Sequence, residues 1–267
     1  MTTVVLTGAA GGIGRATVAR LLARTNAHVV ATDADADALH RAFPEPSPRL
    51  ALRPLDVTDP NAWTELFRAH PAADALVQLA GVLEVGAFVD QPPEVWERML
   101  RVNLLGVLHG TWAAARHFLA RGGGRIVAVA SLAGVAPIPN LAAYTASKFG
   151  VRGFVRALDL ELRPRGVPCT VVCPGPVWTP MVWRQMPKDE AAFLWAGGGP
   201  LPPAAVARAL ERALRRAPPE ILLPRGAGWL ARLAGAFPAV TRRLAPVLER
   251  RARARHRRLQ RRSHATS

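Results

Sequence analysis

Short apolar segments alternate with longer, partly polar ones along most of this chain, and that alternation restricts the fold more than any other feature. We predict strands at 2–8, 28–33, 49–59, 74–81, 124–131, 167–175 and 220–224. Each strand is apolar almost throughout, as in a parallel sheet that helices cover on both faces. Helices between consecutive strands imply right-handed βαβ crossovers, and therefore a parallel sheet.

The predicted helices lie between the second and third strands, from Pro60, and at 11–27, 94–121, 142–163 and 204–216. The strand series continues past the middle of the chain without a linker, so we expect one domain at 1–225 and an extension at 226–267. Half of the 267 residues are hydrophobic, which is enough to bury a sizeable core. Residues 174–203 form an irregular insertion rich in Pro, Gly and Trp, and loops of that length often serve as lids.

The glycine-rich segment VVLTGAAGGIGRA joins the first predicted strand to the first predicted helix. Gly8, Gly12 and Gly14 permit a tight turn and close approach of the backbone to a ligand. The following helix directs free N–H groups and the positive end of its dipole at the loop, where a pyrophosphate fits. A glycine-rich turn without a ligand is the alternative. The strand before and the helix after favour the ligand, and predict an α/β fold with a single Rossmann-type doubly wound sheet of about seven strands.

Asp33 ends the second predicted strand, where a carboxylate can accept hydrogen bonds from the adenosine ribose hydroxyls of a dinucleotide. The same carboxylate would repel the 2′-phosphate of NADP, and Ala34 supplies no cation to offset that repulsion. Arg15 is the nearby candidate for holding a phosphate, although a solvated helix arginine is the other interpretation. We therefore predict NAD as the cofactor, with NADP as the alternative.

The segment AAYTASKFG at 142–150 holds the only tyrosine of the chain and one of its two lysines, against thirty-three arginines. Positions i and i+4 share a helix face, so Tyr144 and Lys148 are predicted to lie side by side. A tyrosine pKa of about 10 is too high for easy proton exchange, and a nearby ammonium lowers it. Tyr144 would then act as a general base toward an alcohol or a general acid toward a ketone. Taken alone, the motif also describes an ordinary helical pair.

Two further polar residues extend this constellation. Ser131 ends the fifth predicted strand, at the carboxyl edge of the sheet where ligands bind, and its hydroxyl could stabilise charge on a substrate oxygen. Asn103 lies among apolar neighbours within the long helical region. It is either a satisfied core amide or a bend in the helix that holds a water, and only the second gives it a place in a proton relay.

Together, TGAAGGIG, LDVTD, VNLLG, VAS, YTASK and PGPVWT resemble the motifs of the short-chain dehydrogenase/reductase family, in order and spacing, over residues 3 to about 225. The resemblance implies that Asn103, Ser131, Tyr144 and Lys148 are catalytic. It implies that the cofactor contacts Gly8, Gly12, Ile13, Gly14, Asp33, Asp56, Val57, Ala80, Gly81, Tyr144, Lys148, Pro174, Gly175, Val177 and Thr179.

Within that set, the resemblance assigns Asp56 to the adenine, and Val177 and Thr179 to the nicotinamide carboxamide. One segment departs from the family pattern, because QLAG at 78–81 stands where Asn-Asn-Ala-Gly is usual. Ala80 and Gly81 are kept, so the backbone can still approach the cofactor. The loss of both asparagines alters local hydrogen bonding rather than the chemistry.

The segment after PG, which folds over the substrate in the family, is rich in large apolar side chains: Trp178, Met181, Trp183, Met186 and Trp195. This composition predicts a hydrophobic secondary alcohol or ketone, such as a steroid, a retinoid or a lipid-derived carbonyl. The substrate-contacting residues are expected to be Ser131, Val135, Tyr144, Trp178 and Met181. A lid that packs on its own domain or on a neighbouring subunit is the alternative.

The resulting hypothesis is an enzyme that transfers hydride reversibly between NAD(H) and such a substrate. An NADP-dependent carbonyl reductase and a catalytically silent nucleotide-binding regulator are the alternatives. The intact Ser, Tyr and Lys set argues against the regulator, which has no need of a tuned phenol. The resemblance also implies a homodimer or homotetramer, with 94–121 and 142–163 as the pairing regions.

Cys169 and Cys173 would point to the same side of a strand about 13 Å apart, too far for a disulfide. A reducing compartment fits, and the cytoplasm is expected. No targeting segment and no apolar stretch long enough to span a membrane are visible. The histidines show no metal-ligand spacing, so we expect no metal.

The positive charge is concentrated at the end of the chain. Of the net charge of +16, residues 241–267 contribute +9, from ten arginines and one glutamate. The apolar residues of GWLARLAGAFPAVTRRLAPVLERR lie on one side and the arginines on another, as in a helix attracted to anionic lipid. Nonspecific nucleic-acid binding and a solvated terminus packed on the core are the other interpretations. No recognised nucleic-acid fold supports specific binding of that kind.

Overall fold

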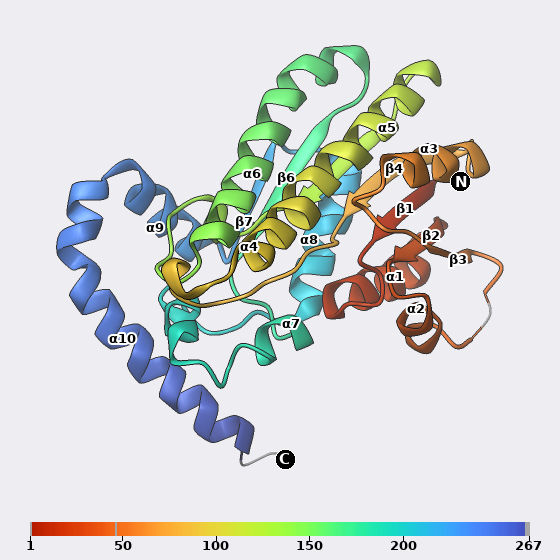
Figure 1. Ribbon diagram of the computed structural model, residues 1–267. Coiled ribbons are helices and arrows are strands. Elements are labelled where there is room, and N and C mark those ends of the chain that lie inside the picture. The colour runs from red at the N-terminus through yellow and green to blue at the C-terminus, as the bar shows by residue number, and fades with distance from the viewer. Residues whose placement is uncertain (1, 46, 265–267) are drawn as a thin grey trace.

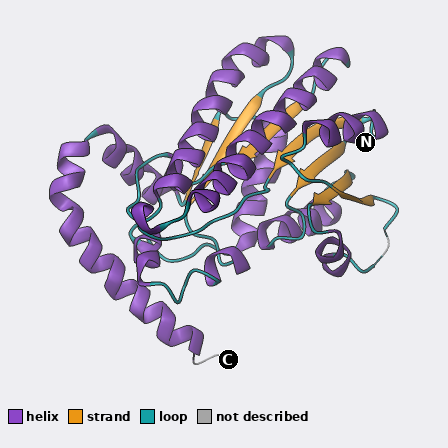
Figure 2. Cartoon of the chain, viewed as in Figure 1, coloured by secondary structure: helices purple, strands orange, loops and turns teal. Residues whose placement is uncertain are grey.

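The computed structural model describes residues 2–45 and 47–264, which form a parallel sheet with helices on both faces (Figures 1 and 2). In the described chain the strands run in the order β3-β2-β1-β4-β5-β6-β7, and neighbouring strands are parallel throughout. Their bounds are β1 Thr3–Thr7, β2 His28–Asp33, β3 Leu50–Pro54, β4 Ala73–Gln78, β5 Arg125–Val129, β6 Cys169–Pro174 and β7 Glu220–Leu223. The predicted doubly wound α/β fold is confirmed.

Alternate residues of each central strand face opposite layers of helices. On β1, Val4 and Leu6 belong to the core cluster beneath one helix layer, whereas Val5 belongs to the cluster beneath the other. Because both faces are covered, β6 is buried along its whole length. Cys169 and Cys173 of that strand are free thiols, as their predicted separation required.

Amphipathic helices supply the two layers. One layer packs α1 and α8 against each other, and the other contains α3, α5 and α6. The bounds are α1 Gly12–Arg24, α2 Ala36–Ala42, α3 Pro60–Ala69, α4 Pro93–Leu100, α5 Gly106–Ala120, α6 Ala142–Leu162, α7 Pro180–Trp183, α8 Pro203–Arg216, α9 Arg225–Ala236 and α10 Pro238–His264. Side chains of Asp35 and Asp59 cap α2 and α3 by accepting backbone hydrogen bonds, which helps to fix where these helices begin.

The long helix predicted at 94–121 is interrupted by a π turn. α4 passes into η2 (Arg101–Leu105), a wider helical turn, and then into α5. The N–H group of Gly106 donates to the carbonyl of Arg101, five residues earlier, which is the hydrogen bond of a π helix. A π turn contains one extra residue, so α4 and α5 differ in the direction of their apolar faces. Accordingly, α4 packs on α6 while α5 packs on α3.

The chain continues beyond β7 into α9 and α10, which extend along one flank of the molecule (Figure 1). α10 runs beside the segment after β6, where α7 and the short helix η5 (Asp189–Trp195) interrupt the predicted irregular insertion. We call residues 178–197 the lid. No described helix has both the length and the apolar character that a membrane crossing requires.

Candidate active site

The strand order reverses between β1 and β4, and ligands of such sheets bind in the crevice at the carboxyl ends of those strands. Thr7 ends β1 there. Its hydroxyl accepts hydrogen bonds from the N–H groups of Leu79 at 3.1 Å and Ala80 at 3.2 Å, immediately after β4. The glycine loop and the segment after β4 are therefore fastened to each other.

Close backbone packing requires glycine in this loop. Gly8 has a φ of +66°, and a Cβ there would lie 2.8 Å from the nitrogen of Ala80. A Cβ on Gly14 would lie 2.2 Å from the carbonyl oxygen of Gly8, and a Cβ on Gly12 would lie 2.8 Å from the Thr179 methyl carbon. The loop thus packs directly against the predicted cofactor residues Ala80 and Thr179.

Asp33 lies directly beside this loop. Its carboxylate accepts a hydrogen bond from the N–H group of Ala10 at 3.0 Å, which orients it at the end of β2. Arg15 and Ala34 are both exposed. The carboxylate that is predicted to contact an adenosine ribose is therefore held in place, whereas Arg15 faces solvent.

The other predicted cofactor residues surround the same edge of the sheet. Asp56 accepts hydrogen bonds from the N–H and hydroxyl groups of Thr58, which shape the turn before α3. The buried Val57 accepts from the indole of Trp63. The remaining residues lie at the start of α1 and at the end of β6 or just after it: Ile13, Pro174, Gly175 and Val177.

The QLAG segment is hydrogen-bonded to neighbouring elements. The amide of Gln78 donates a buried hydrogen bond of 2.8 Å to the hydroxyl of Thr111 on α5. Leu79 and Ala80 are held by Thr7, as described above. The departure from the family pattern therefore leaves this segment well anchored.

Asn103 sits in the π turn η2, fully buried. Its side-chain oxygen accepts from the N–H group of Val82 at 2.8 Å, and its amide donates to the Val82 carbonyl at 2.9 Å and to the Ser147 hydroxyl at 3.2 Å. Ser147 in turn donates to the carbonyl of Tyr144 at 2.7 Å. The side chain is thus a satisfied core amide that ties η2 and the segment after β4 to the start of α6.

Tyr144, Lys148 and Ser131 converge at the carboxyl edge of β5. The ammonium of Lys148 lies 5.6 Å from the centre of the Tyr144 ring and donates to the carbonyl of Val129 at 3.1 Å. Ser131 caps the short helix after β5 and interacts with the Tyr144 phenol. The i, i+4 spacing, seen from the sequence, does place the phenol and the ammonium on one face of α6.

Burial dominates the acid–base properties of this pair. It raises the pKa of Tyr144 to about 12, and the hydrogen bond with Ser131 opposes that rise. It lowers the pKa of Lys148 to about 8. The prediction of a lowered phenol pKa is therefore wrong for this structure, because desolvation outweighs the hydrogen bond with Ser131. At neutral pH the Tyr144 phenol is therefore protonated, and the Lys148 side chain is charged in most molecules. These are the forms that a proton donor beside a cation requires.

The lid forms a third apolar cluster around the phenol. Tyr144 packs in that cluster with Trp178 and Met181, two of the predicted substrate residues. Met186 and Trp195 are buried inside the lid, so these two side chains support the lid rather than line an opening. Val135, also predicted to contact substrate, is buried in the main core cluster and is not a member of the lid cluster.

Polar contacts hold the lid on two sides. Gln185 donates to the carbonyl of Leu83 at 3.0 Å and accepts from the N–H group of Val85, and Lys188 pairs with Glu84. On the other side, α10 provides three more contacts. Arg255 donates to the carbonyl of Trp195, Gln260 donates to that of Met186, and His256 accepts from the Trp195 indole at 2.9 Å.

The contact of His256 with Trp195 predicts that acid loosens the lid. Burial lowers the pKa of His256 below its ordinary 6.5, although Asp189 and the carbonyls of Lys188 and Met186 oppose this. The neutral imidazole is therefore the docked form. Docking is fully stabilised above about pH 6.5 and weakens as the pH falls through the lowered pKa, because the protonated ring cannot accept from the indole.

Hydrogen exchange of the lid and α10 at about pH 5 and about pH 8 would measure this effect. We expect protection of both segments to decrease at the lower pH in the wild type. The His256→Gln variant has no titrating group at position 256, so the protection of its lid and α10 should change much less between the two pH values. An equal change in both proteins would mean that His256 is not responsible.

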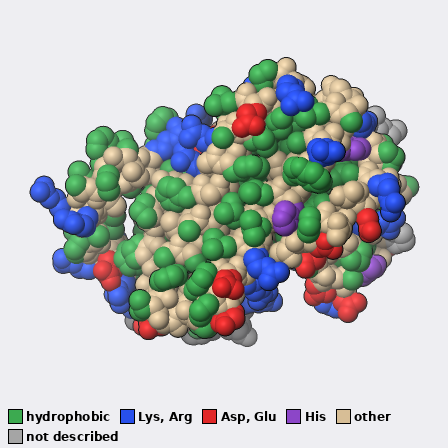
Figure 3. All heavy atoms as spheres, turned by 45° about the horizontal axis from the view of Figure 1, so that its top comes forward, with side chains coloured by type: hydrophobic (Ala, Val, Ile, Leu, Met, Phe, Trp, Pro, Cys, Tyr) green, Lys and Arg blue, Asp and Glu red, His purple; other side chains and the backbone are tan. Residues whose placement is uncertain are grey.

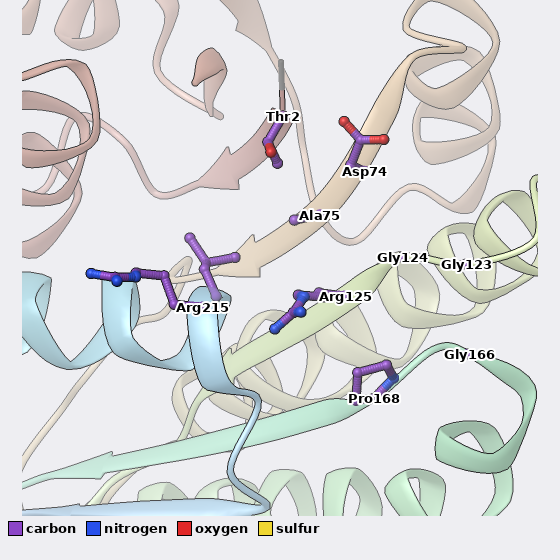
Figure 4. A pocket seen from close by; sticks show the side chains of 10 residues that line it. Thr2, Asp74, Ala75, Gly123, Gly124, Arg125, Gly166, Pro168 and Arg215 are labelled. Carbon is purple, nitrogen blue, oxygen red and sulfur yellow. The ribbon is translucent and has the colours of Figure 1, made fainter. Parts of the chain in front are cut away.

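A separate cavity lies away from these residues. A depression of about 660 Å³ opens at the amino ends of β4, β5 and β6, the opposite edge of the sheet (Figure 4). Asp74 and Arg125 line it, yet none of the predicted catalytic residues does. Within the described residues no cluster of acidic, histidine or cysteine side chains could hold a metal ion.

A family model for short chain dehydrogenases matches residues 2–190. The chain belongs to the short-chain dehydrogenase/reductase family. The match covers the glycine loop, the Tyr144–Lys148 pair and most of the lid, whereas α8, β7, α9 and α10 follow it.

Two curated relatives of this short-chain dehydrogenase are 35% identical to it. One is a 2-keto-3-deoxy-L-fuconate dehydrogenase of Xanthomonas campestris, aligned over 182 residues that are 68% of this chain and 60% of that protein. The other is a D-beta-hydroxybutyrate dehydrogenase of Rhizobium meliloti, aligned over 198 residues, or 71% of this chain and 76% of that protein. The chain thus spans less than two thirds of the length of the first relative.

A solved structure with the same fold is a short chain dehydrogenase from Burkholderia cenocepacia in complex with NADP. It is 24% identical, has a TM-score of 0.78, and the alignment covers 91% of this chain and 97% of the other. At this identity the likeness concerns the fold.

Sequence reasoning missed three residues that organise the site. Ser147 links Asn103 to the backbone of Tyr144, and its place inside YTASK was the available signal. Gln185 ties the lid to Leu83 and His256 ties it to α10, at positions 37 and 108 residues beyond Lys148, where no local pattern marks them. Long-range contacts of this kind depend on the folded arrangement alone.

Proposed function

We propose that this short-chain dehydrogenase interconverts a hydrophobic secondary alcohol and its ketone by hydride transfer with NAD. The observation that carries the proposal is the convergence of Tyr144, Ser131 and Lys148 at the carboxyl edge of the sheet, next to a glycine loop shaped for a dinucleotide. A protein that only binds a nucleotide has no need of this phenol and ammonium. The bound nicotinamide supplies or accepts the hydride.

The residues divide the proton chemistry between them. The Tyr144 hydroxyl donates its proton to the ketone oxygen during reduction and recovers it from the alcohol during oxidation. Ser131 donates a hydrogen bond to the same oxygen and stabilises the charge that develops there. The ammonium of Lys148, close to the ring, favours the phenolate that is left after the transfer. Asn103 acts through Ser147 as a positioning residue for Tyr144.

The apolar lid supports a hydrophobic substrate. Trp178 and Met181 share a cluster with Tyr144, and Trp183 stacks edge-on against Trp178 with ring centres 5.7 Å apart. A substrate oxygen bound at Tyr144 would therefore carry its hydrocarbon part beneath these side chains. Steroids, retinoids and lipid-derived carbonyls have that form.

Turnover with a substrate panel tests this proposal. NADH formation from NAD would be followed with secondary alcohols, steroids, retinol and 3-hydroxybutyrate. We expect activity with the bulky apolar alcohols. Activity with the short hydroxy acid alone would make the hydrophobic class wrong, and tight NADH binding without any turnover would favour a nucleotide-binding regulator.

The choice of NAD rests on Asp33, whose carboxylate is held beside the loop by the N–H group of Ala10. We expect the double variant Asp33→Ala/Ala34→Arg to lose about tenfold or more in NADH affinity and to gain NADPH affinity. The change removes a ribose acceptor and replaces repulsion of the 2′-phosphate with attraction. Asp37→Ala, at an exposed acid of α2, is the matched control. Fluorescence titration with both cofactors gives the ratio of the NADH and NADPH affinities. A wild-type protein that prefers NADPH would contradict the assignment of NAD.

We further propose a homodimer or homotetramer. The helices predicted to pair expose large apolar side chains at Leu105, Trp112, Phe149 and Leu160. Contact between two copies would cover them. Light scattering gives the mass in solution, and a monomer at all concentrations would contradict this proposal.

A further inference from the structure

α9 and α10 carry large apolar side chains that no described part of the chain covers. We call them the apolar row: Trp229, Leu230, Leu233, Phe237, Val240, Leu244 and Val247. Each is at least 44% exposed. Beyond Leu230 they recur every three or four residues, so on each helix they share one side. Such a row is too large to be the scattered apolar exposure that is normal for a protein surface.

The orientation of this row is fixed by the opposite face of α10. Ala252 and His256 are buried against the lid, and His256 accepts a hydrogen bond from Trp195. At the junction of the two helices, the hydroxyl of Thr241 donates to the carbonyl of Ala234 at 2.9 Å. The contacts of α10 with the lid and the hydrogen bond at this junction therefore leave the apolar row facing solvent.

Arginines surround and continue the apolar row. Arg242 and Arg243 lie beside Val240 and Leu244, and Arg250 and Arg251 follow Val247, all four exposed. Glu249 is the single acidic residue among positions 238–260 and already pairs with Arg253. Val247, Arg251 and Arg258 share one side of a helix, so the face that is apolar in the first half of α10 carries arginines in the second. Figure 3 shows hydrophobic and arginine side chains together on this flank of the molecule.

We propose that the apolar row docks onto an anionic phospholipid bilayer. A bilayer surface satisfies both features, because its acyl region accepts Trp229, Leu233 and Leu244 while its phosphates attract the arginines. A second copy of the chain fits less well, since it would bring one arginine-rich helix against another. Neither α9 nor α10 can span the membrane, so the helices lie in the interface.

Docking also has a consequence for access to the site. α10 holds the lid through Trp195 and Met186, so the cover of the candidate active site would lie close to the bilayer. The docking surface itself does not depend on the proposed oxidoreductase activity. Its test therefore measures binding to lipid, with NADH binding as a separate readout.

Vesicle flotation of the whole chain tests the proposal. We expect the protein to float with vesicles of mixed phosphatidylcholine and phosphatidylglycerol, to float far less with phosphatidylcholine alone, and to be released in part by salt. Leu233→Asp/Leu244→Asp should weaken binding to the mixed vesicles about a hundredfold, because two leucines leave the acyl region. Val89→Asp, at an exposed valine of the short helix η1 (Phe88–Asp90) that belongs neither to the apolar row nor to the helices proposed to pair, is the matched control and should float like the wild type.

Circular dichroism and NADH titration would establish that each variant is folded. Absence of wild-type flotation with mixed vesicles would overturn the proposal, as would undiminished flotation of the Leu233/Leu244 variant. Equal flotation with neutral and anionic vesicles would overturn the part assigned to the arginines. A wild-type dimer that the double variant converts to monomers, without lipid binding, would assign the apolar row to a second copy instead.

Discussion

Replacing Tyr144 with phenylalanine is expected to lower kcat by about 10²- to 10⁴-fold while leaving NADH affinity almost unchanged. The phenol is the one tyrosine hydroxyl of the chain, and it lies beside Ser131 and Lys148. Its loss removes the proton donor but keeps the ring, and therefore the packing against Trp178 and Met181. Steady-state rates with a substrate identified from the panel, together with NADH fluorescence, measure the two quantities separately.

Thr145→Val is the matched control for this experiment. It removes the hydroxyl of the next residue on α6, which is buried and has no hydrogen-bond partner among the described residues. We expect it to keep wild-type turnover. Equal turnover of Tyr144→Phe and wild type would show that the phenol is not the acid–base group.

Gly14→Val should reduce NADH affinity by about a hundredfold or more, because its side chain has no space. A Cβ at this position would lie 2.2 Å from the carbonyl oxygen of Gly8 and 2.6 Å from Ala9 Cα. Both are backbone atoms of the loop expected to bind the pyrophosphate. The loop must move, and the N–H groups that would face the phosphates move with it.

The control for this change is Gly153→Ala in α6, where an added Cβ would meet no described atom within 4 Å beyond the backbone of its own helix. It should bind NADH normally and be more stable by up to about 1 kcal/mol, since alanine is the better helix former. Urea denaturation and NADH titration give both values. If Gly14→Val does not fold, Gly12→Ala is informative, because its Cβ meets the Thr179 side chain rather than backbone. Wild-type NADH affinity in a folded Gly14→Val would exclude this loop as the cofactor site.

The fold could be predicted because its determinants are local. The runs around Val4, Val29 and Val171 are apolar on both faces, and only a sheet covered on both sides buries such strands. Tyr144 and Lys148 are four residues apart on a regular helix, so their proximity follows from helix geometry. Residue type and spacing were sufficient in both cases.

Other features could not be predicted, because they depend on distant partners or on burial. The pKa of Tyr144 rises rather than falls because the lid and α6 desolvate the phenol, and no local pattern gives the extent of burial. The sequence predicts Trp195 in a segment that covers the substrate, yet its indole donates a hydrogen bond to His256, 61 residues away. The π turn at Arg101–Leu105 has no distinct periodicity over so short a span.

The π turn at Asn103 makes this helix sensitive to length in a way that the surface loops are not. Deleting one residue between Arg101 and Leu105 would restore ordinary α-helical winding and rotate α4 relative to α5 by about 100°. Either α4 would then no longer pack on α6, or α5 would no longer pack on α3. Asn103 would swing away from Val82 and Ser147 in the same movement. The extra residue thus acts as a phase correction between two helical faces. We expect related sequences to tolerate substitutions in this turn far more readily than insertions or deletions.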